Sequence, residues 1–442
     1  METSGKTGHY VALSHCWGTP GNKKPLMTTK ATLASHMTGI PWNAIPRTYQ
    51  DAIIATHRLG IHMMWIDSLC IIQDSHSDWL RESKRMGAVY ENARLTIAAS
   101  HASDSSGPCF FTRSEPPPAV ELPHVTRSGQ REGSIFATLM PTDYRAISPD
   151  HGPLASRAWA TQEWLLSPRM VFYTADSLMW SCKTISQRET GASHHETSRN
   201  PRWKNIVEKY SARKLTKPTD RLVALEGLRV EMGKKRGGDV YCLGLWKNSM
   251  PDQLLWYCLA SAERSMSQLG LPTWTWASGM NGVRFLDMKG AKNACERFWF
   301  DKDCNTIAMR GVMRKANRSA QSLDQSPQAH LASISASMIG PPPAAAPSYL
   351  THMLFAHDEA LLGWAVLDEP GLMTGTDVFC LQLMNGRLTV KSQSSSNSKV
   401  CRSWLLLLQE DSGGVYHRVG VGVMTTQMPS FDLQSMVQVT IR

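Results

Sequence analysis

Glu163 is the residue whose position in the sequence first suggests chemistry. It lies one helical turn after Trp159 and three residues before Leu166, on the apolar side of a predicted helix. Burial disfavours the charged form of a carboxyl group and raises its pKa, so we interpret Glu163 as a candidate catalytic residue. A structural alternative stays open, in which Glu163 bonds a nearby backbone group or pairs with Arg157 or Arg169.

Asp67 is a second candidate because of where a predicted strand ends. It follows the apolar run Ile61–Ile66, which predicts a strand buried on both faces. In open α/β sheets, ligands bind outside the carboxyl ends of the strands. Ser14, Trp17 and Gly18 leave the first predicted strand, and we predict that they bind substrate in the same crevice as Asp67. A turn or helix-capping role is the structural alternative for Asp67.

Familiar phosphate-binding and zinc-binding motifs are missing from the sequence. It contains neither the Gly-x-x-x-x-Gly-Lys-Ser/Thr phosphate loop nor a Gly-x-Gly-x-x-Gly turn after the first predicted strand. His194-His195-Glu196 lacks the helical-turn spacing of the zinc protease motif, and we interpret it as a polar loop. The sequence therefore predicts no metal site and no bound cofactor.

A cysteine nucleophile is not favoured either. Neighbouring side chains on a strand point to opposite faces, so His15 and Cys16 could not act as a pair. Cys70 could meet Asp67 and His76 only if the loop between them folded favourably. The ten cysteines are dispersed, with no Cys-x-x-Cys pair, and we expect them to be buried and reduced.

The candidate residues lie in a segment where predicted strands and helices alternate. A helix opens at Pro46, a second runs from its N-cap Asp78 to Ala93, and a third runs from Ser156 to Leu166. Apolar runs between them predict the strands Tyr10–Ser14, Ile61–Ile66, Leu95–Ala99 and Met170–Tyr173. This alternation predicts an α/β fold, with a mostly parallel sheet flanked by helices in the N-terminal half.

We expect three regions along the chain. An α/β domain covers residues 1–185, a helical, tryptophan-rich region covers 186–280, and a β-rich region covers 281–442, with a low-complexity insertion near 319–348. Large aromatic side chains need a core or a binding surface. We predict that four tryptophans of the middle region act mainly in packing, namely Trp246, Trp256, Trp274 and Trp276.

Composition narrows the class of protein. The 442 residues include 47 Lys and Arg against 37 Asp and Glu, a formal charge of +10. Only Lys234-Lys235-Arg236 forms a basic cluster, so no nucleic-acid groove is expected. No apolar run approaches the roughly 18 residues of a membrane span, and the first ten residues lack a secretory signal. We therefore expect a cytoplasmic protein.

Several stretches together resemble the fungal heterokaryon incompatibility (HET) domain family. They occur in order over residues 10–182, with weaker agreement over 203–280. The resemblance implies an intracellular fungal protein of non-self recognition that triggers growth arrest or cell death. Longer members carry a stretch before the first block, whereas nine residues precede Tyr10 here, so a piece of the fold or a regulatory segment is expected to be missing. The main blocks are YVALSHCWG (10–18), IPRTYQDA (45–52), WIDSLCIIQD (65–74) and RAWATQE (157–163).

A more distant resemblance links two of these blocks to Toll/interleukin-receptor (TIR) domains. The first strand with its Ser-His-Cys-Trp-Gly end, and the Ser156-x-x-Trp159-x-x-x-Glu163 segment, are similar to the corresponding TIR elements. Some TIR domains cleave NAD with a glutamate on such a helix, and the resemblance implies that Glu163 is this glutamate. Trp17 or Trp159 could then stack on a flat ring of the substrate.

Two other functions remain open on the sequence. A non-catalytic signalling or adaptor module would act by self-association or through a protein partner, and we expect one of the two. An accessory protein of a biosynthetic gene cluster is the weaker alternative. The combined prediction is a TIR-like α/β domain that triggers cell death, with NAD as a candidate substrate.

Overall fold

The computed structural model describes residues 7–18, 25–112, 119–137, 152–175, 177–189, 193–194, 202–260, 269–279, 281–319, 322–323, 341–356, 360–369, 377–391, 397–411, 413–426 and 436–442. The chain divides into two compact units, each considered by itself. The first contains Met1–Pro201, Arg213–Leu215 and Val223–Val230, and the second contains Arg202–Ala212, Thr216–Leu222 and Glu231–Arg442.

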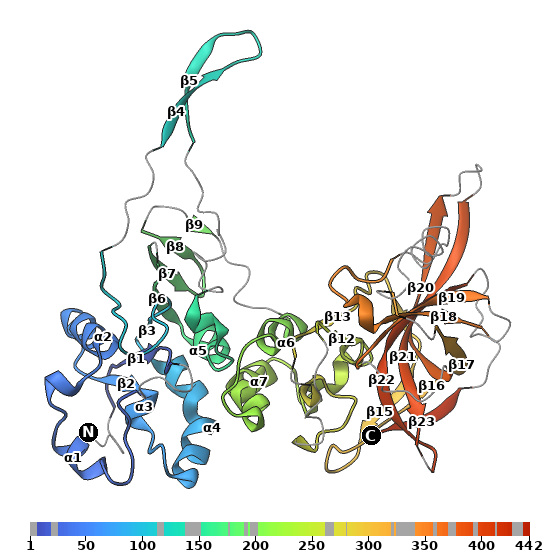
Figure 1. The fold of residues 1–442 in the computed structure, drawn as a ribbon, viewed down its shortest axis with the longest axis horizontal. Helices are drawn as coiled ribbons and strands as arrows, with labels where there is room; N and C mark the ends of the chain where they lie inside the picture. Colours follow the sequence, from blue (N-terminus) through green and yellow to red (C-terminus); the bar gives the residue numbers. More distant parts are fainter. Residues whose placement is uncertain are drawn as a thin grey trace. The chain divides into compact units, whose positions relative to one another are not determined.

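The first unit is built on a sheet with the strand order β2-β1-β3-β6-β7-β8-β9 (Figure 1). The pairs β2–β1, β1–β3 and β3–β6 are parallel, whereas β6 to β9 run antiparallel. The predicted α/β fold is confirmed, but its parallel part is limited to four strands. The strands are β1 (Val11–Ser14), β2 (Met64–Ile66), β3 (Leu95–Ala98), β6 (Arg169–Tyr173), β7 (Leu178–Cys182), β8 (Ser186–Arg188) and β9 (Ser193–His194).

Helices of the first unit connect the parallel strands. In α2, Tyr49 and Ala52 are fully buried and pack with Val11 and Leu13 of β1. The two residues are three positions apart and therefore lie on one face of the helix. The helices of the unit are α1 (Leu33–Thr38), α2 (Arg47–Arg58), α3 (Asp67–Cys70), α4 (His76–Asn92) and α5 (Ala160–Leu166).

Three predicted boundaries were wrong. The strand before Asp67 has only the residues Met64–Ile66 and lies at the sheet edge. Met64 and Trp65 are half-buried, so the strand is not buried on both faces. Helix α4 begins earlier than predicted, because Ser75 and not Asp78 is its N-cap and accepts the backbone amide of Asp78. The segment 156–166 is not one helix, because a 3₁₀ turn at Pro153–Ser156 is followed by extended backbone at Arg157 and then by α5.

Strands β4 (Val120–Val125) and β5 (Arg131–Ala137) pair with each other as a separate hairpin. All residues of both strands are exposed, including Leu122, Ile135 and Phe136. An isolated two-stranded hairpin is marginally stable in water, so apolar side chains on it are an unusual feature.

Tryptophans form the core of the helical part of the second unit. The predicted packing role of Trp246, Trp256, Trp274 and Trp276 is confirmed, since each is at most 1% exposed. The carbonyl of Gly244 accepts indole N–H groups from Trp203, at 2.7 Å, and from Trp276, at 3.0 Å. The elements here are α6 (Trp203–Ser211), α7 (Glu226–Lys234), which begins in the first unit, β10 (Tyr241–Cys242), β11 (Leu245–Trp246), β12 (Trp256–Cys258) and β13 (Val283–Phe285).

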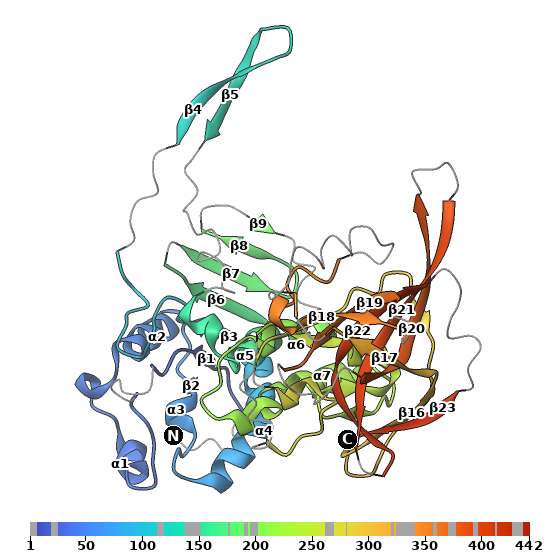
Figure 2. The ribbon, with the colours of Figure 1, turned by 45° about the vertical axis from the view of Figure 1, so that its right-hand side comes forward.

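The C-terminal part is β-rich, as predicted. Among the described strands, six close into an antiparallel ring in the order β20-β17-β18-β19-β22-β21 (Figure 2). Most of the predicted insertion near 319–348 lies outside the described residues. The strands are β14 (Lys292–Asn293), β15 (Glu296–Phe300), β16 (Ile307–Gly311), β17 (Met313–Arg318), β18 (Thr351–Phe355), β19 (Leu361–Leu367), β20 (Asp377–Lys391), β21 (Asn397–Glu410), β22 (Val415–Thr426) and β23 (Val437–Ile441).

One arginine joins the ring to the tryptophan core. Arg418 of β22 is fully buried and donates two hydrogen bonds of 3.0 Å to the carboxylate of Asp368. It also donates to the carbonyls of Leu254, at 2.7 Å, and Trp256, at 2.5 Å, and its guanidinium lies over the Trp256 ring. A buried charge is tolerated only when paired and hydrogen-bonded in this way.

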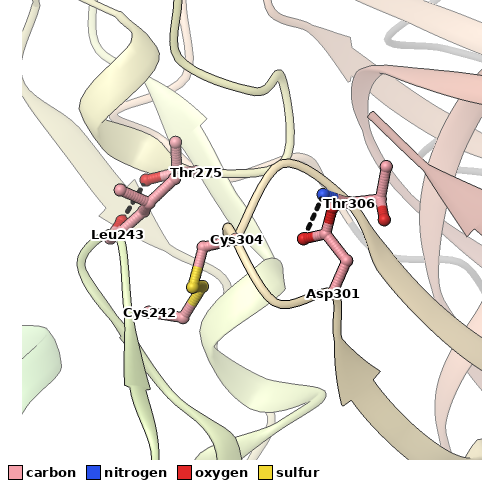
Figure 3. The surroundings of a disulfide bond; sticks show 6 residues. All are labelled: Cys242, Leu243, Thr275, Asp301, Cys304 and Thr306. Atoms are coloured by element: carbon pink, nitrogen blue, oxygen red, sulfur yellow. Dashed lines mark hydrogen bonds between the residues drawn. A yellow bond between two sulfur atoms is a disulfide. The ribbon is translucent and has the colours of Figure 1, made fainter.

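A disulfide corrects the expectation that all ten cysteines are reduced. Cys242 of β10 is bonded to Cys304 in the turn between β15 and β16 (Figure 3). The other eight cysteines are free. The pairing could not be deduced from the sequence, because 62 positions separate the two residues. No helix among the described residues is long and apolar enough to cross a membrane.

Candidate functional site

The first feature of the site is a direct contact between Ser14 and Glu163. Ser14 ends β1, and its hydroxyl donates a hydrogen bond to Oε2 of Glu163, 149 positions later in the chain. Both residues are only 1% exposed. Nearly every residue of α5 is buried, so the helix carries Glu163 to the carboxyl end of β1 as part of the core.

Glu163 forms no ion pair with a cation among the described residues. Within this part of the chain, its Oε1 atom also accepts no hydrogen bond. Arg169 is exposed. Burial raises the pKa of Glu163 above its usual value, and the charge of Asp67 adds to this rise. The positive charge of Arg157 and the hydroxyls of Ser14 and Tyr90 oppose it. An unpaired buried oxygen is costly, which is typical of a functional residue.

Asp67 lies at the same edge of the sheet and is 6% exposed. The indole N–H of Trp17 donates to its two oxygens, at 3.2 and 3.0 Å. The backbone amide of Ser68 donates to Oδ1 at 2.7 Å, so the helix-capping alternative holds in part. The strand register explains why Asp67 lies near Trp17. Leu13 of β1 is paired with Ile66 of β2, so the two strands end side by side.

His15 also lies in the site. In the sequence it was examined only as a possible partner of Cys16. Its Nε2 is 2.8 Å from the Tyr49 hydroxyl, which is 2.8 Å from the Ser68 hydroxyl. Its Nδ1 lies 3.7 Å from Oδ1 of Asp67. Burial lowers the pKa of His15 to about 4, so the ring is neutral at physiological pH. Cys16 packs elsewhere, in an apolar cluster with Trp164 and Phe172.

Arg157 connects the two carboxylates electrostatically. Its guanidinium donates to the carbonyl of His15 and lies 3.8 Å from Oδ2 of Asp67. Burial alone would lower the pKa of Arg157, but the charges of Glu163 and Asp67 outweigh this and raise it. With His15 neutral, an ionised Glu163 leaves the cluster with two negative charges against one positive charge.

The remaining predicted residues lie nearby in the chain. Gly18 has a φ of 96°, a conformation that favours glycine. Trp159 is half-buried at the start of α5, where its carbonyl accepts the amides of Gln162, at 3.0 Å, and Glu163, at 3.3 Å. No described contact places the Trp159 ring against Glu163, so its stacking role stays a prediction.

A small cavity adjoins the Ser14–Glu163 contact. Its volume is about 10 Å³, the space of one water molecule. A nucleotide would need an opened form of the site. Among the described residues, no group of three or more His, Cys, Asp or Glu side chains could hold a metal ion. The chemistry at hand is therefore that of a buried carboxylate with an adjacent hydroxyl. The cavity is lined by Ser14, Leu154, Ala155, Ala160, Trp164, Met170, Phe172 and Arg213.

These features define an α/β domain with a buried polar site at the carboxyl edge of its parallel strands. Residues 10–163 match the family model described as heterokaryon incompatibility protein (HET), and this part of the chain is a HET domain. The match ends at Glu163 itself. The chain has no significant match among the curated proteins or the solved structures with which it was compared. The TIR resemblance therefore stays a prediction.

Proposed function

We propose that this HET domain cleaves the nicotinamide–ribose bond of NAD or a related nucleotide, and that the loss of NAD arrests growth or kills the cell in fungal non-self recognition. The observation that supports the proposal most is Glu163, a buried carboxylate whose Oε2 accepts from Ser14 and whose Oε1 has no hydrogen bond within the described part of the chain. A carboxylate that forms no ion pair within the protein can interact with a ligand instead.

The chemistry needs little more than this carboxylate. The bond between C1′ of the ribose and the ring nitrogen breaks, and its electron pair leaves with neutral nicotinamide. The ribose passes through an oxocarbenium-like state, which a nearby negative charge stabilises. Water then bonds to C1′ and releases a proton, giving ADP-ribose. Pyridinium is already a good leaving group, so no general acid has to protonate it.

The electrostatics of the site favour a cationic substrate group. The site holds two carboxyl groups, Glu163 and Asp67, against one guanidinium, that of Arg157, and Glu163 and Arg157 influence each other's pKa. Inside a low-dielectric site such an excess of negative charge attracts a cation far more strongly than in water. Oxidised nicotinamide carries a positive charge on the ring whose bond would be cut.

The test is Glu163→Gln, which keeps the size of the side chain and removes its charge. We expect nicotinamide release by the purified protein to fall by about a hundredfold or more, the usual scale for loss of a charge that stabilises a transition state. The thermal midpoint should equal or exceed that of the wild type, because the variant has no buried charge at this position and Arg157 keeps Asp67 and the His15 carbonyl as partners.

The matched control is Asp74→Asn, which removes an exposed carboxylate of the same unit outside the β4–β5 hairpin. It should leave both nicotinamide release and growth arrest in a fungal host unchanged. A stable Glu163→Gln protein that keeps full nicotinamide release would refute the enzymatic role of this residue.

A second candidate function is a non-catalytic signalling module. The exposed β4–β5 hairpin, with Leu122, Ile135 and Phe136 in solvent, is the observation in its favour. In that case Glu163→Gln would keep its toxicity, whereas changing Ile135 and Phe136 to Ser would abolish it. The two functions therefore separate on two variants assayed in the same host.

A further inference from the structure

A basic segment returns to the first unit next to the candidate site. Residues Arg213–Leu215 belong to this unit although the residues on either side belong to the other. Lys214 lies beside Arg157 in a parallel bridge. Its amide donates to the carbonyl of Ser156 at 2.6 Å, and its carbonyl accepts the amide of Ala158 at 2.9 Å. We call residues 213–215 the basic strap.

The strap is fixed to the backbone that leads into Glu163. Ser156, Arg157 and Ala158 immediately precede α5, and two of them use their backbone groups to bind Lys214. This pairing also explains why the predicted helix does not begin at Ser156. Because the bonds involve only backbone atoms of Lys214, its exposed side chain is available in solvent.

Arg213 reaches the same cavity as Ser14. Six of the eight residues that line this cavity are aliphatic or aromatic, and Ser14 and Arg213 are the other two. Ser14 donates to Glu163 and is therefore one hydrogen bond from the candidate carboxylate. Arg213 lines the cavity and the buried carboxylate of Glu163 lies beyond Ser14, so residues of opposite charge flank this part of the site.

We propose that Arg213 and Lys214 bind the diphosphate of the substrate, so that the site selects a pyridine dinucleotide over the corresponding nucleoside. The proposal rests on the proposed function of Glu163 and names its substrate class. In NAD, one ribose separates the cationic nicotinamide ring from the anionic diphosphate. The carboxylates face the first charge and the strap faces the second. Arginine forms paired, charge-assisted hydrogen bonds to phosphate oxygens, and lysine adds a point charge.

The role of the strap is in binding and not in bond cleavage. Arg213→Gln should raise the KM for NAD by about tenfold, the scale of one lost charge-assisted contact, with kcat within about threefold of the wild type. The KM for nicotinamide riboside, which has no phosphate, should not change. Arg213→Lys should recover part of the loss, and Lys214→Gln should show a smaller one.

A binding assay tests the strap without relying on catalysis. ADP, the diphosphate-bearing half of NAD, is titrated into the full-length wild type, Arg213→Gln and Lys214→Gln by calorimetry. We expect binding to the wild type and at least a tenfold weaker affinity in Arg213→Gln. Lys84→Gln, an exposed lysine of α4, is the control and should bind as the wild type does. Circular dichroism and a melting curve establish that each variant is folded.

The outcomes separate the two proposals. If ADP binds the wild type and not Arg213→Gln, but NAD is not cleaved, the strap proposal stands and the enzymatic proposal fails. If ADP does not bind the wild type, or binds all four proteins equally, the strap proposal is refuted whatever Glu163 does. If Arg213→Gln raised the KM for NAD and the KM for nicotinamide riboside by the same factor, the strap proposal would also be refuted. Phosphate recognition cannot affect a substrate that has no phosphate.

Discussion

At the scale of single residues, the site holds a buried histidine and a buried carboxyl group. The two groups change the stability of the protein with pH in opposite directions. His15 is neutral because burial lowers its pKa from 6.5 to about 4. Glu163 keeps its proton to a higher pH than a free glutamate. Both groups have a preference for the uncharged form, which couples the fold to pH.

The pH dependence of stability separates the two groups. Between pH 6.5 and about 4, the unfolded chain binds a proton at His15 and the folded chain does not, so the free energy of unfolding decreases as the pH falls. We expect His15→Gln to remove this part of the decrease. The measurement is urea unfolding of both proteins across this range. A curve for His15→Gln parallel to that of the wild type would contradict the buried, neutral histidine.

For Glu163 the sign is reversed. The folded chain binds its proton more tightly than the unfolded chain, so the free energy of unfolding decreases as the pH rises from the unfolded value of 4.5 through the higher folded pKa. Glu163→Gln has no such proton to lose. We therefore expect its stability relative to the wild type to grow with pH over this window in the same urea experiment.

At the scale of elements, two glycines allow α4 and the first part of α7 to approach. A Cβ on Gly227 would lie 2.6 Å from Oε1 of Gln162 and 2.8 Å from Cα of Gly87. The amide of Gly227 also donates to that Gln162 oxygen at 2.7 Å, on the helix that carries Glu163. This packing helps to fix the position of α5.

Gly227→Ala should destabilise the protein, although alanine normally favours a helix over glycine by about 0.5–1 kcal/mol. The clash with the Gly87 backbone should cost about 1–3 kcal/mol, the usual range for overpacking, and should exceed that gain. Gly233→Ala in the same helix is the control, because its nearest neighbour is Trp246 at 3.5 Å, an ordinary contact. Thermal melting should show a lower midpoint for the first variant and an equal or higher one for the second.

How much the sequence could predict depends on the range of the interactions. The carboxyl ends of parallel strands share one edge, and so Ser14, Trp17 and Asp67 could be placed together from local patterns. The contribution of His15 could not be predicted, because it depends on Tyr49 and Ser68 meeting at long range. Nor could the strap, since the pairing of Arg157 with Lys214 has no local signature. The closure of six strands into a ring is likewise a property of tertiary packing.

At the scale of the whole molecule, we expect the stability of the second unit to depend strongly on the buried ion pair between Arg418 and Asp368. Arg418 donates hydrogen bonds to Asp368 and to the carbonyls of Leu254 and Trp256, so it joins two distant parts of the chain to β22. Arg418→Met keeps an apolar stem and removes all four bonds. We expect a loss of about 3–5 kcal/mol in the free energy of unfolding, the usual cost of removing one partner of a buried pair.

The double variant Arg418→Met with Asp368→Leu tests whether the loss of stability comes from the unpaired charge of Asp368. Because it also removes the buried negative charge, part of the lost stability should return. Denaturant unfolding of the wild type and the three variants gives the coupling energy. Additive losses would contradict the ion pair as the source of the effect.

The path of the chain between the two units has a consequence for dissecting the protein. The chain passes from one unit to the other five times between Pro201 and Glu231. A fragment that ends at the family match, or even at Pro201, keeps Ser14 and Glu163 but lacks the strap and residues 223–230. A protease that cuts once near residue 200 would leave both products incomplete. Function should therefore be mapped by point substitution, because a shortened protein that proves inactive would report only its missing segments.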